Sequence, residues 1–127
     1  MSSIDAKASA LLVSQDLFFY SKITSTANEL GFRIDVEGDV AEVVSKLPTS
    51  TYRCLILDLS TRGLRVADII GALPTANRPA VIAFGSHVLA ARLNEAREAG
   101  CNEVMPRSKF SATLPEILAR YLQVSRN

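Results

Sequence analysis

The chain has 127 residues, of which 48% are hydrophobic, and its formal net charge is +1 at pH 7. This length and composition suit one domain with a buried core, and the small net charge gives no reason to expect nucleic acid or an anionic membrane as a partner. No apolar run is long enough to cross a bilayer, and the N-terminus lacks the pattern of a signal peptide. We therefore expect a single cytoplasmic domain over residues 1–127, with an ordered core over about residues 8–123.

The first half of the sequence alternates between short apolar runs and segments with helical spacing. Strands are predicted over residues 9–13 and 32–36, separated by a helix over residues 16–30 that ends at a glycine. A second helix is predicted over residues 40–47, with acidic residues near its start and a proline at its end. The continuous apolar run over residues 52–59 predicts a strand that is buried on both faces, as in a parallel sheet.

The same alternation continues through the second half. A short helix is predicted over residues 66–73, followed by a strand over residues 79–84. Apolar residues at helical spacing over residues 89–96 predict a fourth helix, which ends at Gly100, and residues 101–106 form a fifth predicted strand. Thr113 and Glu116 have the spacing of a capping box, and they predict the start of the last helix.

Five strand–helix units in strict alternation predict a three-layer α/β fold with a doubly wound parallel five-stranded sheet in the order 2-1-3-4-5. In this order the strand sequence reverses between the first and third strands, where ligands bind at the carboxyl ends. The residues at those two ends are Ser14, Gln15 and Asp16 after the first strand and Asp58 after the third. The sequence therefore predicts that these four residues share one site.

The segments "CLILDLS" and "AREAGCNEVMPRS" and the spacing from Ser14 to Gly31 resemble the receiver domain of bacterial two-component response regulators, from about residue 8 to residue 122. The resemblance implies a phospho-acceptor position at Asp58. It matches the family's two acidic magnesium ligands to Ser14 and Gln15, and the hydroxyl residue that ends strand 4 to Gly85. It also matches the family's aromatic residue to Val104 and its lysine to Arg107, with Ser108 in place of the following proline.

Neutral residues at the acidic positions predict that this site binds magnesium weakly at most and needs no cofactor. Mg²⁺ prefers hard oxygen ligands, and Asp58 is the one secure carboxylate. Asp16 is interpreted either as a third ligand or as an acid favoured at the start of a helix. We expect Arg107 to pair with Asp58 and to replace the charge of the metal; the alternative is a solvated loop residue.

The remaining candidate residues have simpler interpretations. His87 is expected on a surface loop, because it has no cysteine or carboxylate partners at ligand spacing. Arg62 and Arg65 are expected to be solvated. Cys54 and Cys101 are expected to be reduced and to pack as small hydrophobes.

Three functions are compatible with this pattern. The first is a stand-alone atypical receiver, not an enzyme, that signals through contact with a histidine kinase or another signalling protein. The resemblance places that contact, or a homodimer, on the face of the fourth helix, fifth strand and last helix, which includes Leu89, Arg92, Arg97, Phe110 and Tyr121. The second is a genuine Asp58 phospho-acceptor in a phosphorelay. The third is a flavodoxin-like small-molecule binder. A flavin site needs a phosphate-binding loop rich in Ser, Thr and Gly after the first strand, and "SQDLFF" is bulky and poorly suited to that role.

Overall fold

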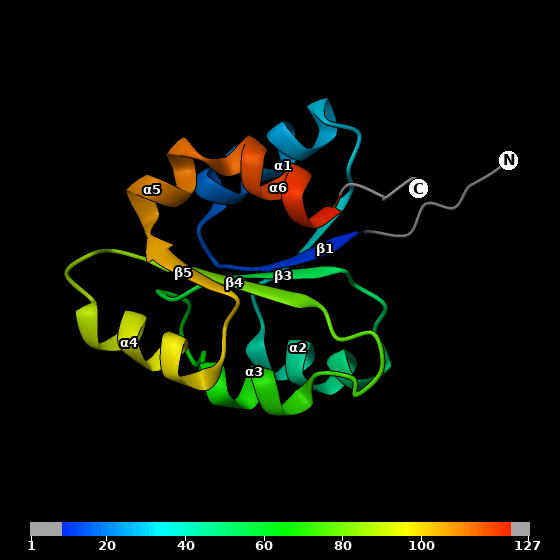
Figure 1. Cartoon of the computed structure of the whole chain (residues 1–127), viewed down its shortest axis with the longest axis vertical. Helices are drawn as coiled ribbons and strands as arrows, with labels where there is room; N and C mark the ends of the chain where they lie inside the picture. The colour runs from blue at the N-terminus through cyan, green and yellow to red at the C-terminus, as the bar shows by residue number, and fades with distance from the viewer. Residues whose placement is uncertain (1–8, 123–127) are drawn as a thin grey trace, which may run out of the picture.

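The computed structural model describes residues 9–122 and has one five-stranded parallel sheet in the order β2-β1-β3-β4-β5 (Figure 1). The strands are β1 (Ala10–Val13), β2 (Ile34–Glu37), β3 (Cys54–Asp58), β4 (Ala80–Gly85) and β5 (Glu103–Pro106). The predicted fold class and strand order are therefore confirmed.

Helices cover both faces of the sheet. Figure 1 shows α1, α5 and α6 on one side and α2, α3 and α4 on the other. Their bounds are α1 (Leu17–Glu29), α2 (Val40–Lys46), the 3-10 turn η1 (Leu47–Thr49), α3 (Val66–Ala72), α4 (Ala90–Ala99), α5 (Arg107–Ala112) and α6 (Leu114–Leu122). Across residues 9–122, no helix combines the length and apolar character that a membrane span requires.

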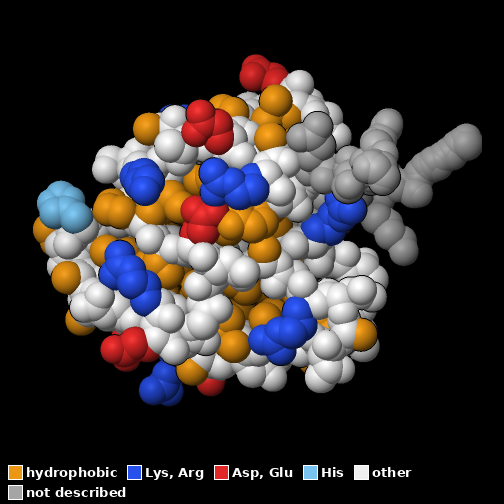
Figure 2. Space-filling view, viewed as in Figure 1, with side chains coloured by type: hydrophobic (Ala, Val, Ile, Leu, Met, Phe, Trp, Pro, Cys, Tyr) orange, Lys and Arg blue, Asp and Glu red, His pale blue; other side chains and the backbone are white. Residues whose placement is uncertain are grey.

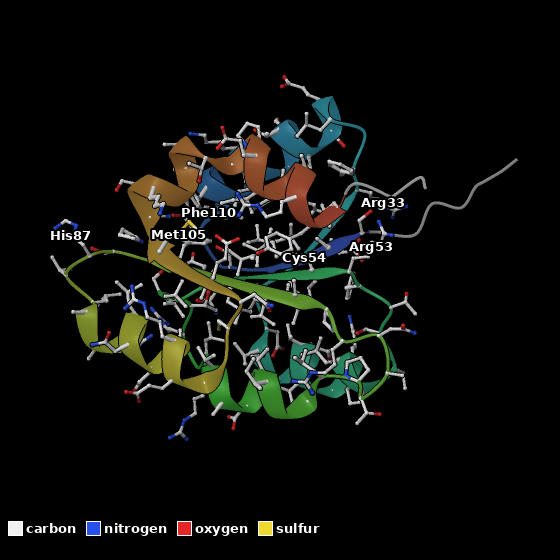
Figure 3. All side chains as sticks on the ribbon, viewed as in Figure 1. Arg33, Arg53, Cys54, His87, Met105 and Phe110 are labelled. Carbon is white, nitrogen blue, oxygen red and sulfur yellow. The ribbon has the colours of Figure 1, made fainter. Side chains whose placement is uncertain are left out.

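Two hydrophobic clusters fill the spaces between these layers, and β3 contributes to both. Leu55 and Leu57 pack into the cluster beneath α2, α3 and α4, while Cys54 and Ile56 pack into the cluster beneath α1, α5 and α6. Every residue of β3 is buried, which confirms the prediction from its continuous apolar run. Figure 3 shows Cys54 and Phe110 in the layer between the sheet and α6 and α5.

Both cysteines pack against the hydrophobic core, as the sequence predicts. Cys54 and Cys101 are free, with Cys54 fully buried and Cys101 half-buried. Burial raises the pKa of Cys54 to about 12 and that of Cys101 to about 11, so both side chains stay protonated at neutral pH.

The segment after β5 differs from the prediction. A short helix, α5, begins directly after the strand, and Thr113 ends it. The Thr113 hydroxyl donates to the carbonyl oxygen of Lys109 at 2.8 Å, so its side chain closes α5 and does not form the predicted capping box. The last helix, α6, nevertheless begins at the next residue, Leu114, as predicted. Helical periodicity could not reveal α5, because Phe110 is its one large apolar residue; its ring is fully buried and stacks on Phe84 with centroids 4.5 Å apart.

Candidate functional site

The carboxyl ends of β1 and β3 lie side by side, as predicted. Val13 is paired with Leu57 in the sheet, so the next residues, Ser14 and Asp58, lie side by side at its carboxyl edge. Both side chains are buried: Ser14 is 4% exposed and Asp58 is 2% exposed. Asp58 is also paired with Phe84 of β4, which places it at the centre of this edge.

Hydroxyl groups satisfy both carboxylate oxygens of Asp58. The Ser14 hydroxyl donates to Oδ2 at 2.7 Å. On the other side, Ser60 donates to Oδ1 twice, from its hydroxyl at 2.6 Å and from its backbone N–H at 3.0 Å. The Ser14 hydroxyl oxygen in turn accepts the backbone N–H of Asp16 at 3.1 Å. Asp58 is therefore a hydrogen-bonded buried carboxylate, which needs no cation to avoid an unsatisfied oxygen.

Gln15 bridges two loops at the same edge. Its amide nitrogen donates to the carbonyl oxygen of Gly38 at 2.9 Å, and its amide oxygen accepts the backbone N–H of Arg62 at 3.2 Å. A Cβ at position 38 would lie 3.2 Å from both the Gln15 Cγ and the Ser14 carbonyl oxygen, so glycine permits this approach. The side chain matched to a magnesium ligand thus ties the β2–α2 loop to the β3–α3 loop.

Asp16 forms the N-cap of α1. Its Oδ1 accepts the backbone N–H of Phe19 at 3.1 Å, and its Oδ2 accepts a bond from Arg107 Nη2. These two donors, the Phe19 N–H first and the Arg107 guanidinium second, hold the pKa of Asp16 below its ordinary value. The prediction of an acid at the helix start is therefore confirmed, and that carboxylate is already neutralised by a cation.

The predicted ion pair between Arg107 and Asp58 is wrong. Arg107 pairs with Asp16, and its guanidinium stacks over the Phe19 ring at 4.3 Å from the centroid. The physical reason is accessibility: Asp58 is buried and its oxygens are held by hydroxyls, while the Asp16 side chain is 34% exposed and faces the start of α5.

This pairing gives a testable prediction for Asp16. Replacing Arg107 with alanine should raise the pKa of Asp16 toward its ordinary value but leave it lowered, because the Phe19 N–H still donates. A carboxyl group whose pKa is lowered on folding stabilises the fold above its unfolded pKa, and this stabilisation is lost as pH falls through the folded pKa. In the Arg107→Ala variant this contribution is smaller, so its stability should depend less steeply on pH in the acid range. NMR titration of the Asp16 carboxyl carbon measures the shift. Arg120→Ala, which removes a cation that pairs with Glu103 instead, is the matched control, and equal titration curves for Arg107→Ala and wild type would contradict the assignment.

Gly85 stands at the hydroxyl position, and Leu59 fills the space beside it. A Cβ at position 85 would lie 3.2 Å from the Leu59 Cβ and 3.4 Å from its Cδ1. Leu59 is 2% exposed; its backbone N–H donates to the Phe84 carbonyl at 2.9 Å, and its carbonyl accepts from Arg92 Nη1 at 2.6 Å. The neighbouring Ser86 hydroxyl accepts the Val88 N–H at 3.3 Å within the β4–α4 loop.

The remaining predicted residues lie as follows. Val104 is half-buried and packs against the cluster beneath α2, α3 and α4, so an aliphatic side chain stands at the position matched to the family's aromatic residue. His87, Arg62 and Arg65 are exposed, as predicted. Sequence reasoning missed Ser60 and Leu59. Serine is common in turns, so Ser60 gave no signal of a role at the site, and Leu59 reads as a continuation of the apolar run of β3.

The donors at this edge do not fit a magnesium site. Over residues 9–122 there is no group of three or more His, Cys, Asp or Glu side chains that could hold a metal ion. Asp58 offers one carboxylate whose oxygens already accept hydrogen bonds, Gln15 turns its amide to two backbone groups, and Asp16 is paired with Arg107. Mg²⁺ demands near-octahedral oxygen ligands and binds mainly through carboxylates, and both carboxylates at this edge already have partners.

Comparison with solved structures identifies the fold. A receiver domain of a sensor histidine kinase from Pseudomonas aeruginosa, which has a magnesium ion coordinated in its active-site cleft, matches with a TM-score of 0.76 at 22% identity, covering 94% of this chain and 100% of that chain. A response regulator from Hahella chejuensis matches with a TM-score of 0.79 at 17% identity, covering 95% and 99%. A phosphorylated cyanobacterial phytochrome response regulator matches with a TM-score of 0.76 at 14% identity, covering 95% and 98%.

No family model matches the sequence, and no curated protein matches it significantly. The structural matches nevertheless agree on one fold over most of the chain. The chain therefore has the fold of response-regulator receiver domains, as the resemblance of its sequence predicted.

Proposed function

We propose that this chain is an atypical receiver module that transmits signals by protein–protein contact and does not depend on phosphoryl transfer to Asp58. Its receiver fold supports a role in signal transduction, and its structural neighbours are signalling modules. The proposal gives the domain no catalytic activity of its own. Its partner is a protein of the same signalling system.

One observation carries the proposal: both oxygens of Asp58 accept hydroxyl hydrogen bonds at a position that is 2% exposed. Phosphoryl transfer develops charge on the transferred oxygens, and metal ions neutralise it. Here Ser14 supplies a neutral donor where a carboxylate ligand would stand, and Gly85 has no hydroxyl to bind a phosphoryl oxygen. The site therefore stabilises the unphosphorylated Asp58 carboxylate through hydrogen bonds, and it has few groups that would stabilise a phosphoryl group on Asp58.

A phospho-acceptor role for Asp58 is the second candidate. The aspartate is retained at the carboxyl end of the central strand β3, and a structural neighbour is described as a phosphorylated response regulator. In this alternative, Ser14 and Ser60 would turn away from Asp58 to admit a metal ion and a phosphodonor.

Incubation with acetyl phosphate and magnesium, followed by intact-protein mass spectrometry, separates the two candidates. We expect no mass gain of one phosphoryl group, because the pocket lacks the anionic ligands that would hold the metal. Asp58→Asn is the matched control, because it keeps the shape of the side chain and removes the acceptor carboxylate. A phosphoryl adduct that appears on the wild type and disappears in this variant would favour the second candidate.

A further inference from the structure

A hollow of about 610 Å³ lies between the start of α3 and α4, outside the site at Asp58. Figure 1 shows these two helices next to each other on one face of the sheet, and they are in direct contact. Two buried leucines, Leu59 and Leu64, form the base of the hollow, while Val66, Ala67 and Ala99 line its sides. The hollow therefore presents apolar surface between two helices, at a size that is ordinary for binding sites.

Charged side chains of both signs surround this hollow. Arg65 and Arg92 line it near the carboxyl edge of the sheet, and Glu95 and Glu98 line it farther along α4. Arg92 donates through Nη1 to the Leu59 carbonyl at 2.6 Å, whereas none of the other three forms an ion pair within the described part of the chain. Figure 2 shows basic and acidic side chains close together over α4, at the lower left of the molecule. The hollow thus has a positive end and a negative end.

Two of these charges have the sign that the neighbouring helix end disfavours. Arg65 is the N-cap of α3 and its side chain makes no capping hydrogen bond, so a cation stands at the positive end of the helix dipole. Glu98 lies in the last turn of α4, where the dipole disfavours an acid. A group of opposite charge supplied from outside would therefore stabilise each of these two side chains.

The opposite side of α4 offers fewer unpartnered groups. On the face of α4, β5 and α6 that the sequence suggested for a partner, Phe110 is fully buried and the Tyr121 hydroxyl donates to Glu103. Arg97, on the same helix as the charges around the hollow, donates to the Asn94 side-chain oxygen at 2.9 Å. These groups are occupied by internal contacts, so the unpartnered charges of α4 lie on its α3 side.

We infer that the hollow between α3 and α4 is a docking groove for an extended segment of a partner protein, in which one apolar residue separates an acidic residue from a basic one. This inference rests on the proposed function, and it names the chemistry of the partner. The acid would pair with Arg65 and Arg92, the base would pair with Glu95 and Glu98, and the apolar side chain would cover Val66 and the base of the hollow.

The spacing of the charges fits such a segment. At about 1.5 Å per residue, the midpoint between Glu95 and Glu98 lies about 7 Å from Arg92 along the axis of α4. Two residues of extended chain also span about 7 Å, and their side chains point to the same side, while the residue between them points to the other. A second copy of this chain is a poorer occupant, because two hollows set face to face would leave the space between them unfilled.

The test uses capped synthetic peptides in which valine stands between glutamate and lysine, in either order. Matched peptides carry glutamine in place of the glutamate, of the lysine, or of both. Binding to the ¹⁵N-labelled chain is measured by NMR titration. We expect shifts at residues 59–67 and 92–99, and each replacement by glutamine should weaken binding by about fivefold. Added salt should weaken the binding of the doubly charged peptides.

Variants then locate the groove. The double variant Glu95→Gln, Glu98→Gln should lose the preference for lysine over glutamine, and Arg65→Gln should reduce the preference for glutamate. Glu95→Lys combined with Glu98→Lys should reverse the first preference, so that a peptide with glutamate in place of lysine binds better than the original. Arg97→Gln is the matched control, because Arg97 lies on α4 outside the hollow, and it should leave binding unchanged.

Four results would each overturn the inference: equal binding of charged and uncharged peptides, no binding at all, shifts confined to α1, β5 and α6, or the same loss in Arg97→Gln as in the groove variants. Shifts at the groove that depend on protein concentration without peptide would identify a second copy as the occupant, and would also overturn it. The phosphodonor experiment reads Asp58 alone, so a phosphoryl adduct would overturn the proposed function without any change in peptide binding.

Discussion

Replacing Ser14 with aspartate should lower the free energy of unfolding by about 3 kcal/mol at neutral pH without divalent metal. The Ser14 hydroxyl lies 2.7 Å from Asp58 Oδ2, and both residues are almost fully buried. The substitution exchanges a hydrogen-bond donor for a second negative charge. Two carboxylates at that separation and burial cannot both ionise without strong repulsion.

The pH dependence of this loss has a definite sign. The introduced carboxyl should keep its proton to a pKa well above its unfolded value. A group whose pKa is raised on folding destabilises the folded state above the unfolded pKa, and this effect disappears as pH falls below it. The difference in stability between the variant and the wild type should therefore shrink steadily from neutral pH toward about pH 4, where the unfolded carboxyl itself takes up a proton.

Magnesium should restore much of the stability of this variant and leave the wild type unchanged. The two adjacent carboxylates of the variant supply anionic oxygens for the metal. A metal that binds only the folded state stabilises that state by mass action, and we expect about 1 to 3 kcal/mol at millimolar magnesium. Urea unfolding with magnesium or with a chelator measures this.

Ser14→Ala is the matched control for these measurements. It removes one hydrogen bond to Asp58, and it should cost about 1 to 2 kcal/mol with no response to metal. A wild type that gains as much stability from magnesium as the aspartate variant would contradict our account of the site.

The sheet could be predicted because its signal is carried by continuous segments of sequence. β3 is apolar at every position before Asp58, and that run alone indicates burial on two faces. Alternation with helical segments then leaves few parallel topologies, and the strand order brings Ser14 and Asp58 to one edge. The location of the site followed from the topology, without knowledge of any side-chain position.

The partners of each side chain could not be predicted in the same way. Arg107 had two carboxylates within the same predicted site, and the choice of Asp16 over Asp58 depends on which one faces the start of α5. That helix was itself missed, because a six-residue segment with one large apolar residue has no helical period. Ser60 is of a residue type common in turns. Its two hydrogen bonds to Asp58 depend on the geometry of the loop, which the sequence does not reveal.

Replacing Gly85 with threonine should destabilise the fold by about 2 kcal/mol, although it restores the residue type that the receiver resemblance implies at this position. The added Cβ would lie 3.2 Å from the Leu59 Cβ, which is tighter than ordinary van der Waals contact. Leu59 cannot easily move away, because its N–H is bonded to Phe84 and its carbonyl to Arg92. The cost therefore comes from overpacking a buried contact.

A double-mutant cycle isolates this contact. Leu59→Ala alone should cost about 2 to 4 kcal/mol, because it opens a cavity beneath β4. In the combined variant the Cβ contact remains, but the contacts with the leucine Cγ and Cδ1 are gone and the threonine side chain can enter that cavity, so the total loss should fall short of the sum by about 0.5 kcal/mol or more. Urea unfolding of the four proteins measures the coupling, and strictly additive losses would show that the outer atoms of the Leu59 side chain do not crowd the position.

A second glycine provides the control for backbone effects. Gly71 lies in the exposed part of α3, and a Cβ there would meet nothing within 4 Å. Gly71→Ala should stabilise the protein by about 0.5 to 1 kcal/mol, whereas Gly85→Ala should destabilise it, since the same added carbon meets Leu59. Opposite signs at the two positions would show that the cost at Gly85 comes from contact with Leu59 and not from the backbone. Arg92 of α4 donates to the Leu59 carbonyl, so the same residue also links the β3–α3 loop to α4.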